Sequence, residues 1–320
     1  MIQNDDNPLV FDRKLLRTRR HRAALQGADA GADYLIAQAA DLLADRLLDL
    51  THRFDHGIEL GSHKGVLAQR LLQTGRVGSF THTDICAAML PDHGSRIVLD
   101  EEFLPLAPAS QDLIASALSL HWVNDLPGAL LQIRQALKPD GLFLATLFGA
   151  ETLKELRHCL MLAEDEISGG VSPRVSPFAD LSDMAGLMQR AGFALPVADV
   201  DRVTVTYAHP LKLMQDLRMM GETGLSRGRT KSFTPRRVLL RASELYLQQF
   251  AETDPETGTA RIFATFDMIH VSGWAHAKTQ QQPLQPGTAS QRLADALNTT
   301  EQDAGDAAAP GRYNKNKTDK

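Results

Sequence analysis

The feature that most constrains this chain is a regular alternation of short apolar strands with helices between residues 56 and 148. Segments 66–72 and 126–137 repeat apolar residues three and four positions apart, which predicts helices. Strands are predicted at 56–60, 79–83, 96–99, 113–116 and 142–148. Because this alternation implies parallel pairing with right-handed crossovers, we expect a doubly wound α/β sheet. Such a sheet binds ligands beyond the carboxyl ends of its strands.

Helices are expected both before and after this sheet. The segment 10–22 contains six Lys and Arg residues and predicts a basic helix, with Asp12 as its N-cap. Residues 33–50 repeat apolar side chains at helical spacing, which predicts a second helix. Beyond the sheet, helices are predicted at 151–166, 180–191, 210–220 and 235–250, and late strands at 203–207 and 261–271.

This pattern divides the chain into four parts. A basic, helical N-terminal extension covers residues 1–50, and a ligand-binding core covers residues 51–150. Residues 151–277 hold the remainder of the core with a helical cap and the late strands. Residues 278–320 are rich in Gln, Ala, Thr, Asp and Pro. Since such a segment buries too little apolar surface to offset its ordering, we expect a disordered tail.

Composition argues against several functional classes. A net charge of -5 and a pI near 6.1 are unlike a general nucleic-acid binder, which is usually basic. Two cysteines cannot form a disulfide framework and fit a reducing compartment, so we expect a cytoplasmic protein. No apolar run is long enough to cross a bilayer, and residues 1–10 lack a signal-peptide pattern.

The first candidate binding element is the turn at 59–65, which reads ELGSHKG and follows the first strand. Glycines here let the backbone approach a ligand, so Gly61, Ser62 and Gly65 are candidate binding residues. Glu59 is suited to take an ammonium group directly or through water. Taken alone, the turn is equally consistent with a structural tight turn. A dinucleotide phosphate fits less well, because Glu59 would repel it.

Polar residues also follow the next three strands. Asp84 is suited to accept both hydroxyls of a ribose, although for an aspartate taken alone a helix cap is the more common role. Asp100 and Glu101 follow the third strand, where Asp100 is suited to accept the exocyclic amine of adenine. Ser116 ends the fourth strand. Because the carboxyl ends of parallel strands share one edge, these features fit a single nucleoside ligand that carries an amino group.

Several motifs resemble those of class I methyltransferases, in particular the type 11 group that includes the malonyl-carrier methyltransferase of biotin synthesis. A closer resemblance, over nearly all of the chain before the predicted tail, is to the complex I assembly factor 5 family. Its most specific motif is LSLHWVNDLP at 118–127. The others are FDR at 11–13, DEEFLP at 100–105, LKPDG at 137–141, SPRVSPF at 172–178 and DLRMMGE at 216–222.

The resemblance implies a class I methyltransferase (Rossmann-like) fold with S-adenosylmethionine as cofactor, in a bacterial relative of a mitochondrial protein. It also implies hydroxylation of an arginine in a respiratory complex I subunit, with peripheral association near the membrane and no nucleic-acid partner. Two alternatives remain open. One is a conventional S-adenosylmethionine-dependent methyltransferase acting on a small molecule or a carrier. The other is a non-catalytic assembly chaperone that docks through its basic helix.

The chain departs from that family within the turn. Members usually carry Gly at the position of His63, and Cys or another small residue at that of Ser62. The imidazole of His63 either crowds the methionine part of the cofactor or points to solvent. Gly61 and Gly65 are retained.

Other residues have competing interpretations. His82 and Asp84 have the spacing of two iron ligands, but Asp84 fits a ribose and His82 falls within a strand, so no metal site is predicted. His121 is the candidate catalytic residue, as a substrate contact or general base, against simple packing at a strand end. For Trp122 we favour core packing.

Two segments outside the core also have open interpretations. The basic segment 10–22 is a solvated helix face, a docking surface for an acidic protein or a cap on the cofactor site. The loop 169–178 is a lid over the site or a rigid connector.

Overall fold

The computed structural model describes residues 9–26, 31–253, 258–280 and 293–300. The chain forms two compact units, Met1–Lys278 and Thr279–Lys320. The described residues of the second unit include one short helix, α9 (Leu293–Ala296). Most of the predicted tail at 278–320 lies outside the described residues, so its disorder stays a prediction, as do the other domain boundaries.

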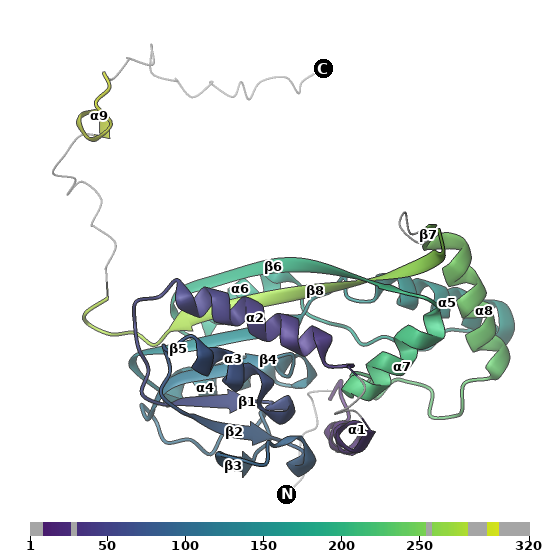
Figure 1. The fold of residues 1–320 in the computed structure, drawn as a ribbon, viewed down its shortest axis with the longest axis horizontal. Coiled ribbons are helices and arrows are strands. Elements are labelled where there is room, and N and C mark those ends of the chain that lie inside the picture. The colour runs from purple at the N-terminus through teal and green to yellow at the C-terminus, as the bar shows by residue number, and fades with distance from the viewer. Residues whose placement is uncertain (1–8, 27–30, 254–257, 281–292, 301–320) are drawn as a thin grey trace, which may run out of the picture. The chain divides into compact units, whose positions relative to one another are not determined.

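One sheet organises the first unit (Figure 1). Its strands are β1 (Gly57–Leu60), β2 (Phe80–Asp84), β3 (Ser95–Val98), β4 (Gln111–Ala117), β5 (Leu137–Phe148), β6 (Ala194–Tyr207), β7 (Ala251–Thr253) and β8 (Ala260–Trp274). Strands β3-β2-β1-β4-β5 lie in that order and are parallel. Strand β8 runs antiparallel to β5 and also pairs with β6 and β7. The predicted doubly wound sheet is confirmed, with an antiparallel edge added.

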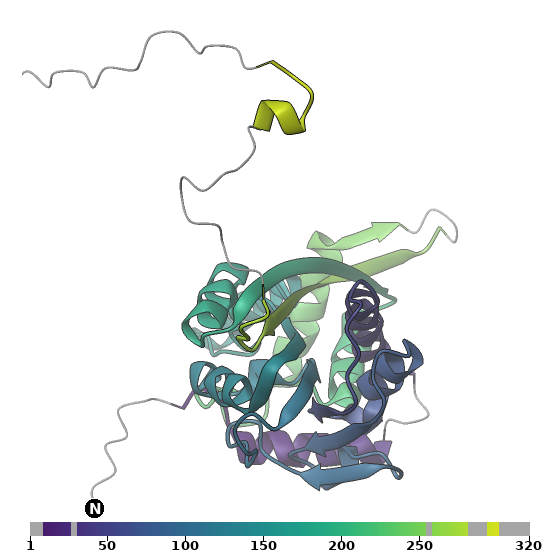
Figure 2. The same cartoon turned by 90° about the vertical axis from the view of Figure 1, so that its left-hand side faces the viewer.

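Helices cover both faces of this sheet, as the view along the strands shows (Figure 2). Helices α2 (Tyr34–Leu48) and α3 (Val66–Gln73) pack on one face, and α4 (Leu126–Ala136) and α6 (Leu181–Arg190) on the other.

Alternation along β5 explains the two cores. Leu142 and Leu144 join the core under α2, whereas Phe143 and Ala145 join the core under α4, because successive side chains point to opposite faces. Both faces of the central strands are therefore apolar, as expected for a parallel sheet.

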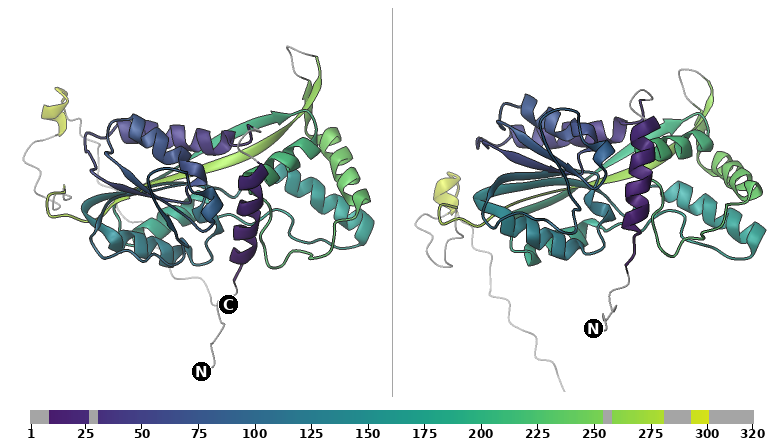
Figure 3. Two further views of the ribbon diagram at one scale, coloured as in Figure 1. Left: turned by 60° about the horizontal axis from the view of Figure 1, so that its bottom comes forward. Right: turned by 90° about the horizontal axis from the view of Figure 1, so that it is seen from below.

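The remaining helices lie beyond the carboxyl ends of the parallel strands. The arrowheads of β1, β2 and β3 point toward α1 (Arg13–Gln26), which packs against α7 (Pro210–Met220) (Figures 1 and 3). Helices α5 (Lys154–Ser168) and α8 (Arg236–Gln249) pack on each other beside α7 and complete the predicted helical cap. Oδ1 of Asp12 accepts a hydrogen bond from the backbone N of Leu15 at 3.0 Å, which confirms the predicted N-cap. Among the described helices, none has the length and apolarity required to cross a membrane.

Most strands lie within one to three residues of their predicted bounds, but two begin well before their predicted starts. Strand β6 begins at Ala194 rather than at residue 203, because an edge strand pairs along one side and tolerates residues such as Pro196 and Arg202. Strand β5 begins at Leu137 and includes the predicted turn at 138–141. There Leu137 pairs with Gln111, and a register shift absorbs the turn before regular pairing resumes.

Phe143→Ala is expected to lower the free energy of unfolding by about 3–5 kcal/mol, because it empties a fully buried position stacked on Phe193. Phe103→Ala, at a position that is 73% exposed, is the matched control and should change that free energy by less than about 0.5 kcal/mol. Urea unfolding followed by circular dichroism measures both. Equal losses in the two variants would contradict this core.

Candidate functional site

Glycines shape the turn that follows β1. Gly61 and Gly65 have φ angles of 71° and 81°, in the left-handed region that favours glycine. A Cβ atom at Gly61 would lie 2.2 Å from Oγ of Ser119, so no side chain fits there. The turn therefore lies directly against the residues that follow β4.

Glu59 braces the turn from within the protein. Its fully buried carboxylate accepts hydrogen bonds from Oγ of Ser62 (3.0 Å) and the backbone N of Ala68 (2.9 Å). It also lies 2.6 Å from Nδ1 of His82. These contacts engage both oxygens, so in this structure Glu59 positions the start of α3. They also account for His82 without a metal.

The centre of the site is the fully buried guanidinium of Arg20, which α1 inserts between the strand ends. Its Nη1 donates to Oδ2 of Asp84 (3.2 Å) and Oε1 of Glu101 (3.3 Å). Its Nη2 donates to Oγ of Ser119 (2.8 Å). We call Asp84, Glu101 and Ser119 the acidic cage. It joins the carboxyl ends of β2 and β4 to the segment after β3.

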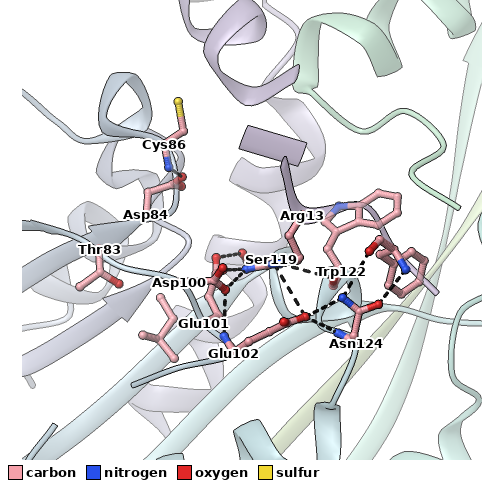
Figure 4. A network of polar contacts seen from close by, with 12 residues as sticks. Arg13, Thr83, Asp84, Cys86, Asp100, Glu101, Glu102, Ser119, Trp122 and Asn124 are labelled. Carbon is pink, nitrogen blue, oxygen red and sulfur yellow. Dashed lines mark hydrogen bonds and ion pairs between the residues drawn. The ribbon is translucent and has the colours of Figure 1, made fainter. Parts of the chain in front are cut away.

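A second arginine of α1 closes the rim of the cage (Figure 4). Nη2 of Arg13 donates to the carboxylates of Asp100 and Glu101, and its Nη1 donates to the backbone O of Trp122 at 3.3 Å. Asp100 also accepts from the backbone N of Glu102 (3.0 Å), and its side chain stays 31% exposed. Helix α1 therefore covers the cage, as the cofactor-cap interpretation of the basic segment expects.

Burial and charge set the protonation states in the cage. Burial alone would raise the pKa of Glu101, but Arg13 and Arg20 outweigh it and lower this pKa to about 2. Burial raises the pKa of Asp84, and Arg20 opposes that shift without cancelling it. Such a cage holds a cation or a neutral group with several hydrogen-bond donors.

His63 lies against this cage. It is 5% exposed, and its Nε2 is 3.5 Å from Nη2 of Arg20, so of the two orientations left open, the one toward solvent does not occur. Burial, with the charge of Arg20, lowers the pKa of His63 to about 3, which keeps the imidazole neutral. Nδ1 of His63 and Nε of Arg20 are buried and have no hydrogen-bond partner among the described residues. Buried polar atoms left unpaired are rare and suit a site that receives another group.

The other predicted site residues surround the cage. Oγ of Ser116 donates to the backbone O of Leu60 at 2.8 Å, which ties the ends of β4 and β1 together. Gly65 begins α3, and Asp100 stands at the exposed rim. Of the predicted residues, Asp84 and Glu101 therefore meet at one point, with Gly61 beside them.

His121 and Trp122 converge on Glu222, which comes just after α7. Oε2 of Glu222 accepts from Nε1 of Trp122 (2.9 Å) and lies 3.1 Å from Nε2 of His121. Burial would raise the pKa of Glu222, but its contacts with His121 keep that pKa below its usual range. Trp122 is 2% exposed and packs edge-on against Phe11, which confirms core packing. The catalytic role of His121 stays a prediction.

A cavity of about 270 Å³ is lined in part by Glu222. Arg174 and Ser176 also line it, so the loop 169–178 forms part of its wall. The apolar lining includes the rings of Trp122, Phe148 and Phe178 and the side chains of Leu153, Leu156, Leu160, Met214, Leu217 and Leu239. An apolar pocket with a few convergent polar groups has the composition of a small-ligand or side-chain site.

One group of potential metal ligands lies on β6 and β8 within the described part of the chain. It comprises Asp199, Asp201 and His270. Arg46 of α2 forms ion pairs with both aspartates, at 3.1 Å in the case of Asp201. Because this guanidinium already pairs with both carboxylates, we interpret the group as an ion-pair network.

Arg20, Ser119 and Glu222 are absent from the predicted site. For Arg20 a signal exists, because it lies on the face of α1 that also carries the buried residues Leu16 and Ala23, two turns after Arg13. A cation on an apolar helix face requires a buried anion. Ser119 and Glu222 fall within the motifs 118–127 and 216–222, but no charge or helical spacing singles out either residue as part of the site.

The class of protein follows from this geometry and from likeness to known proteins. Residues 58–145 match the methyltransferase domain family. YcgJ from Bacillus subtilis aligns with 73% of this chain and 98% of its own, at 14% identity and a TM-score of 0.50. A putative methyltransferase from Bacillus halodurans aligns with 73% of this chain and 99% of its own, at 13% identity and a TM-score of 0.50. The chain thus has the predicted class I methyltransferase fold.

Sequence relatives define the family more closely. Arginine-hydroxylase NDUFAF5, mitochondrial, from Rattus norvegicus is 38% identical over 89% of this chain and 83% of that protein. The protein of the same name from Homo sapiens is 37% identical over 88% of this chain and 81% of that protein. The chain belongs to the NDUFAF5 arginine-hydroxylase family, as its motifs predict. Malonyl-[acyl-carrier protein] O-methyltransferase from Halorhodospira halophila is 30% identical over 87% of this chain and 93% of that protein.

Acid should destabilise the fold partly through His63. Its pKa falls from 6.5 to about 3 on folding, so below pH 6.5 the unfolded chain binds a proton that the folded chain does not. Stability is therefore lost as pH falls. His63→Gln should reduce the slope of unfolding free energy between about pH 6 and pH 4 by up to about 1.4 kcal/mol per pH unit. Urea unfolding across that range measures the slope. His21→Gln, at an exposed site, should leave it unchanged, and an unchanged slope in His63→Gln would refute the burial argument.

Proposed function

We propose that this protein binds S-adenosylmethionine at the acidic cage and hydroxylates an arginine of a respiratory complex I subunit during assembly. The observation that carries the proposal is the closeness of the cage to a cavity with an acidic end. Glu222 and Trp122 both line that cavity, and the backbone O of Trp122 accepts a hydrogen bond from Nη1 of Arg13 at the rim of the cage (3.3 Å). The names of the NDUFAF5 relatives support arginine as the target side chain.

The cage residues have the chemistry that this cofactor requires. A carboxylate such as Asp84 accepts the two hydroxyls of a ribose, and Asp100 or Glu101 accepts the exocyclic amine of adenine. Gly61 allows close approach of the backbone. When bound, S-adenosylmethionine supplies a cationic sulfur with a transferable methyl group.

The guanidinium of Arg20 has to leave Asp84 for the ribose of this cofactor to bind there. Oδ2 of Asp84 contacts Arg20, while Oδ1 accepts from the backbone N of Cys86 at 2.8 Å. A ribose and the guanidinium of Arg20 therefore compete for one carboxylate. We infer that release of Arg20 accompanies cofactor binding.

The cavity suits a guanidinium. Trp122, Phe148 and Phe178 provide aromatic rings for cation–π contact, and Leu156 and Leu217 provide apolar surface for an aliphatic stem. Both hydrogen bonds to Glu222 end on Oε2, which leaves Oε1 without a partner among the described residues. A substrate arginine that pairs with Oε1 would satisfy this charge.

We place this activity in the cytoplasm, with the protein at the membrane periphery where a complex I subunit is assembled. Cys86 and Cys159 are buried and unpaired, which supports a reducing compartment. Hydroxylation inserts one oxygen atom into the arginine and requires an oxidant from outside the chain.

Asp84→Asn should weaken S-adenosylmethionine binding by at least about tenfold, because a neutral amide replaces the carboxylate that accepts the ribose. Isothermal titration calorimetry measures the affinity. Asp92→Asn is the matched control, since Asp92 is fully exposed on the segment after β2. Equal affinity of wild type and Asp84→Asn would contradict the site. If the His63→Gly variant binds the cofactor and the wild type does not, the imidazole of His63 blocks the site.

Glu222→Gln should lower modification of the target arginine by at least about tenfold, since truncating a buried charge pair costs about 2–5 kcal/mol. Mass spectrometry of complex I subunits from cells expressing each variant measures the modified fraction. Glu244→Gln, on the exposed side of α8, is the control. A gain of oxygen supports hydroxylation, whereas a gain of a methylene unit would assign methyl transfer instead. An unmodified subunit in wild-type cells would contradict both.

A further inference from the structure

A strongly basic surface adjoins the cavity. Two neighbouring hollows of about 600 Å³ and about 530 Å³ share lining residues from α1 and from the segment that precedes α8. Together we call them the basic hollow, which is lined by Arg19, Arg22, Arg218, Arg229, Lys231 and Phe233.

Most cations of the basic hollow lack carboxylate partners. Within the described part of the chain, the five named above form no ion pair, whereas a sixth, Arg174, also lines the hollow and pairs with Glu164. Arg19 donates instead to the backbone O of Gly224. Burial, then the nearby charges of Arg229 and Arg22, lowers the pKa of Arg19. Positive charge is thus concentrated here and not neutralised by the protein itself.

This concentration contrasts with the rest of the molecule. The whole chain has a net charge of -5. The side chain of Phe233 is 100% exposed in the middle of the cations, where nothing in the described structure covers it. Aromatic and arginine side chains are the residue types that dominate binding energy at protein interfaces.

The basic hollow is continuous with the cavity. Arg218 and Thr223 line both, and so do Arg174, Gly224 and Thr234. A segment bound in the hollow would therefore lie at the entrance to the pocket that contains Glu222. The hollow is positively charged and the pocket contains the negative charge of Glu222. Acidic residues therefore suit the hollow, and a cationic side chain suits the pocket.

We propose that the basic hollow docks an acidic segment of a partner protein, with an apolar side chain of that segment against Phe233. A short acidic segment matches a small basic area on an otherwise acidic protein. Nucleic acids and anionic membranes present extended negative charge, which would also meet the acidic remainder of this chain. Docking is independent of which reaction follows, so it goes beyond the function proposed above.

The test uses the full-length protein and a short fluorescein-labelled peptide of Asp, Glu and Gly with one central Phe. Fluorescence anisotropy at low and high salt measures its binding. Arg22→Glu combined with Arg229→Glu should weaken binding by at least about tenfold, because attraction becomes repulsion. Phe233→Ser should weaken it at both salt concentrations. Binding to wild type should fall as salt screens the charges.

The matched control is Arg17→Glu combined with Arg237→Glu, which changes net charge equally at exposed positions outside the hollow. Peptide binding retained in the control supports the proposal, and equal loss in both double variants overturns it. The proposal is also overturned if the protein prefers a single-stranded RNA or phosphatidylglycerol vesicles to the peptide, or if it binds none of these probes. Unchanged melting temperatures show that the variants are folded. Because no turnover is measured, failure here is distinct from failure of the proposed reaction.

Discussion

The ion pairs of Arg20 with Asp84 and Glu101 govern the organisation of the site. Taking charges out of water costs several kcal/mol for each ion, and only close opposite charges and hydrogen bonds offset that cost. Loss of Arg20 would leave the buried carboxylate of Asp84 without an ionic partner, whereas Glu101 would keep Arg13. Helix α1 is therefore tied by ion pairs to the ends of the parallel strands, although it precedes the sheet in sequence.

Each of two acidic positions has a histidine beside it or beside its arginine. His63 lies against Arg20 in the acidic cage at the strand ends, and His121 lies against Glu222 just after α7. Burial keeps His63 neutral, so it adds no charge beside the cage. This arrangement matches an enzyme that binds a nucleoside cofactor on the sheet and a cationic side chain beneath the cap.

The features that could be predicted are those set by residues that are neighbours in the sequence. Apolar alternation identifies the parallel strands, and the glycines of the turn identify the edge at which ligands bind, because both are properties of a few consecutive residues. The pairing of Arg20 with Asp84 joins positions 64 apart, and that of Trp122 with Glu222 joins positions 100 apart. No local pattern specifies such contacts. The polar start of β6 was likewise hidden, because edge strands accept residues that central strands exclude.

Helix α1 presents neighbouring arginines to different surroundings, Arg20 to the acidic cage and Arg19 to the basic hollow. Any ligand that favours a displaced helix at one surface shifts the same equilibrium that the other surface senses. By thermodynamic linkage, a partner that raises cofactor affinity by some factor must itself bind more tightly, by that same factor, once the cofactor is present. Under the two proposals, one helix would make docking of the acidic segment and cofactor binding mutually dependent without direct contact between the two ligands.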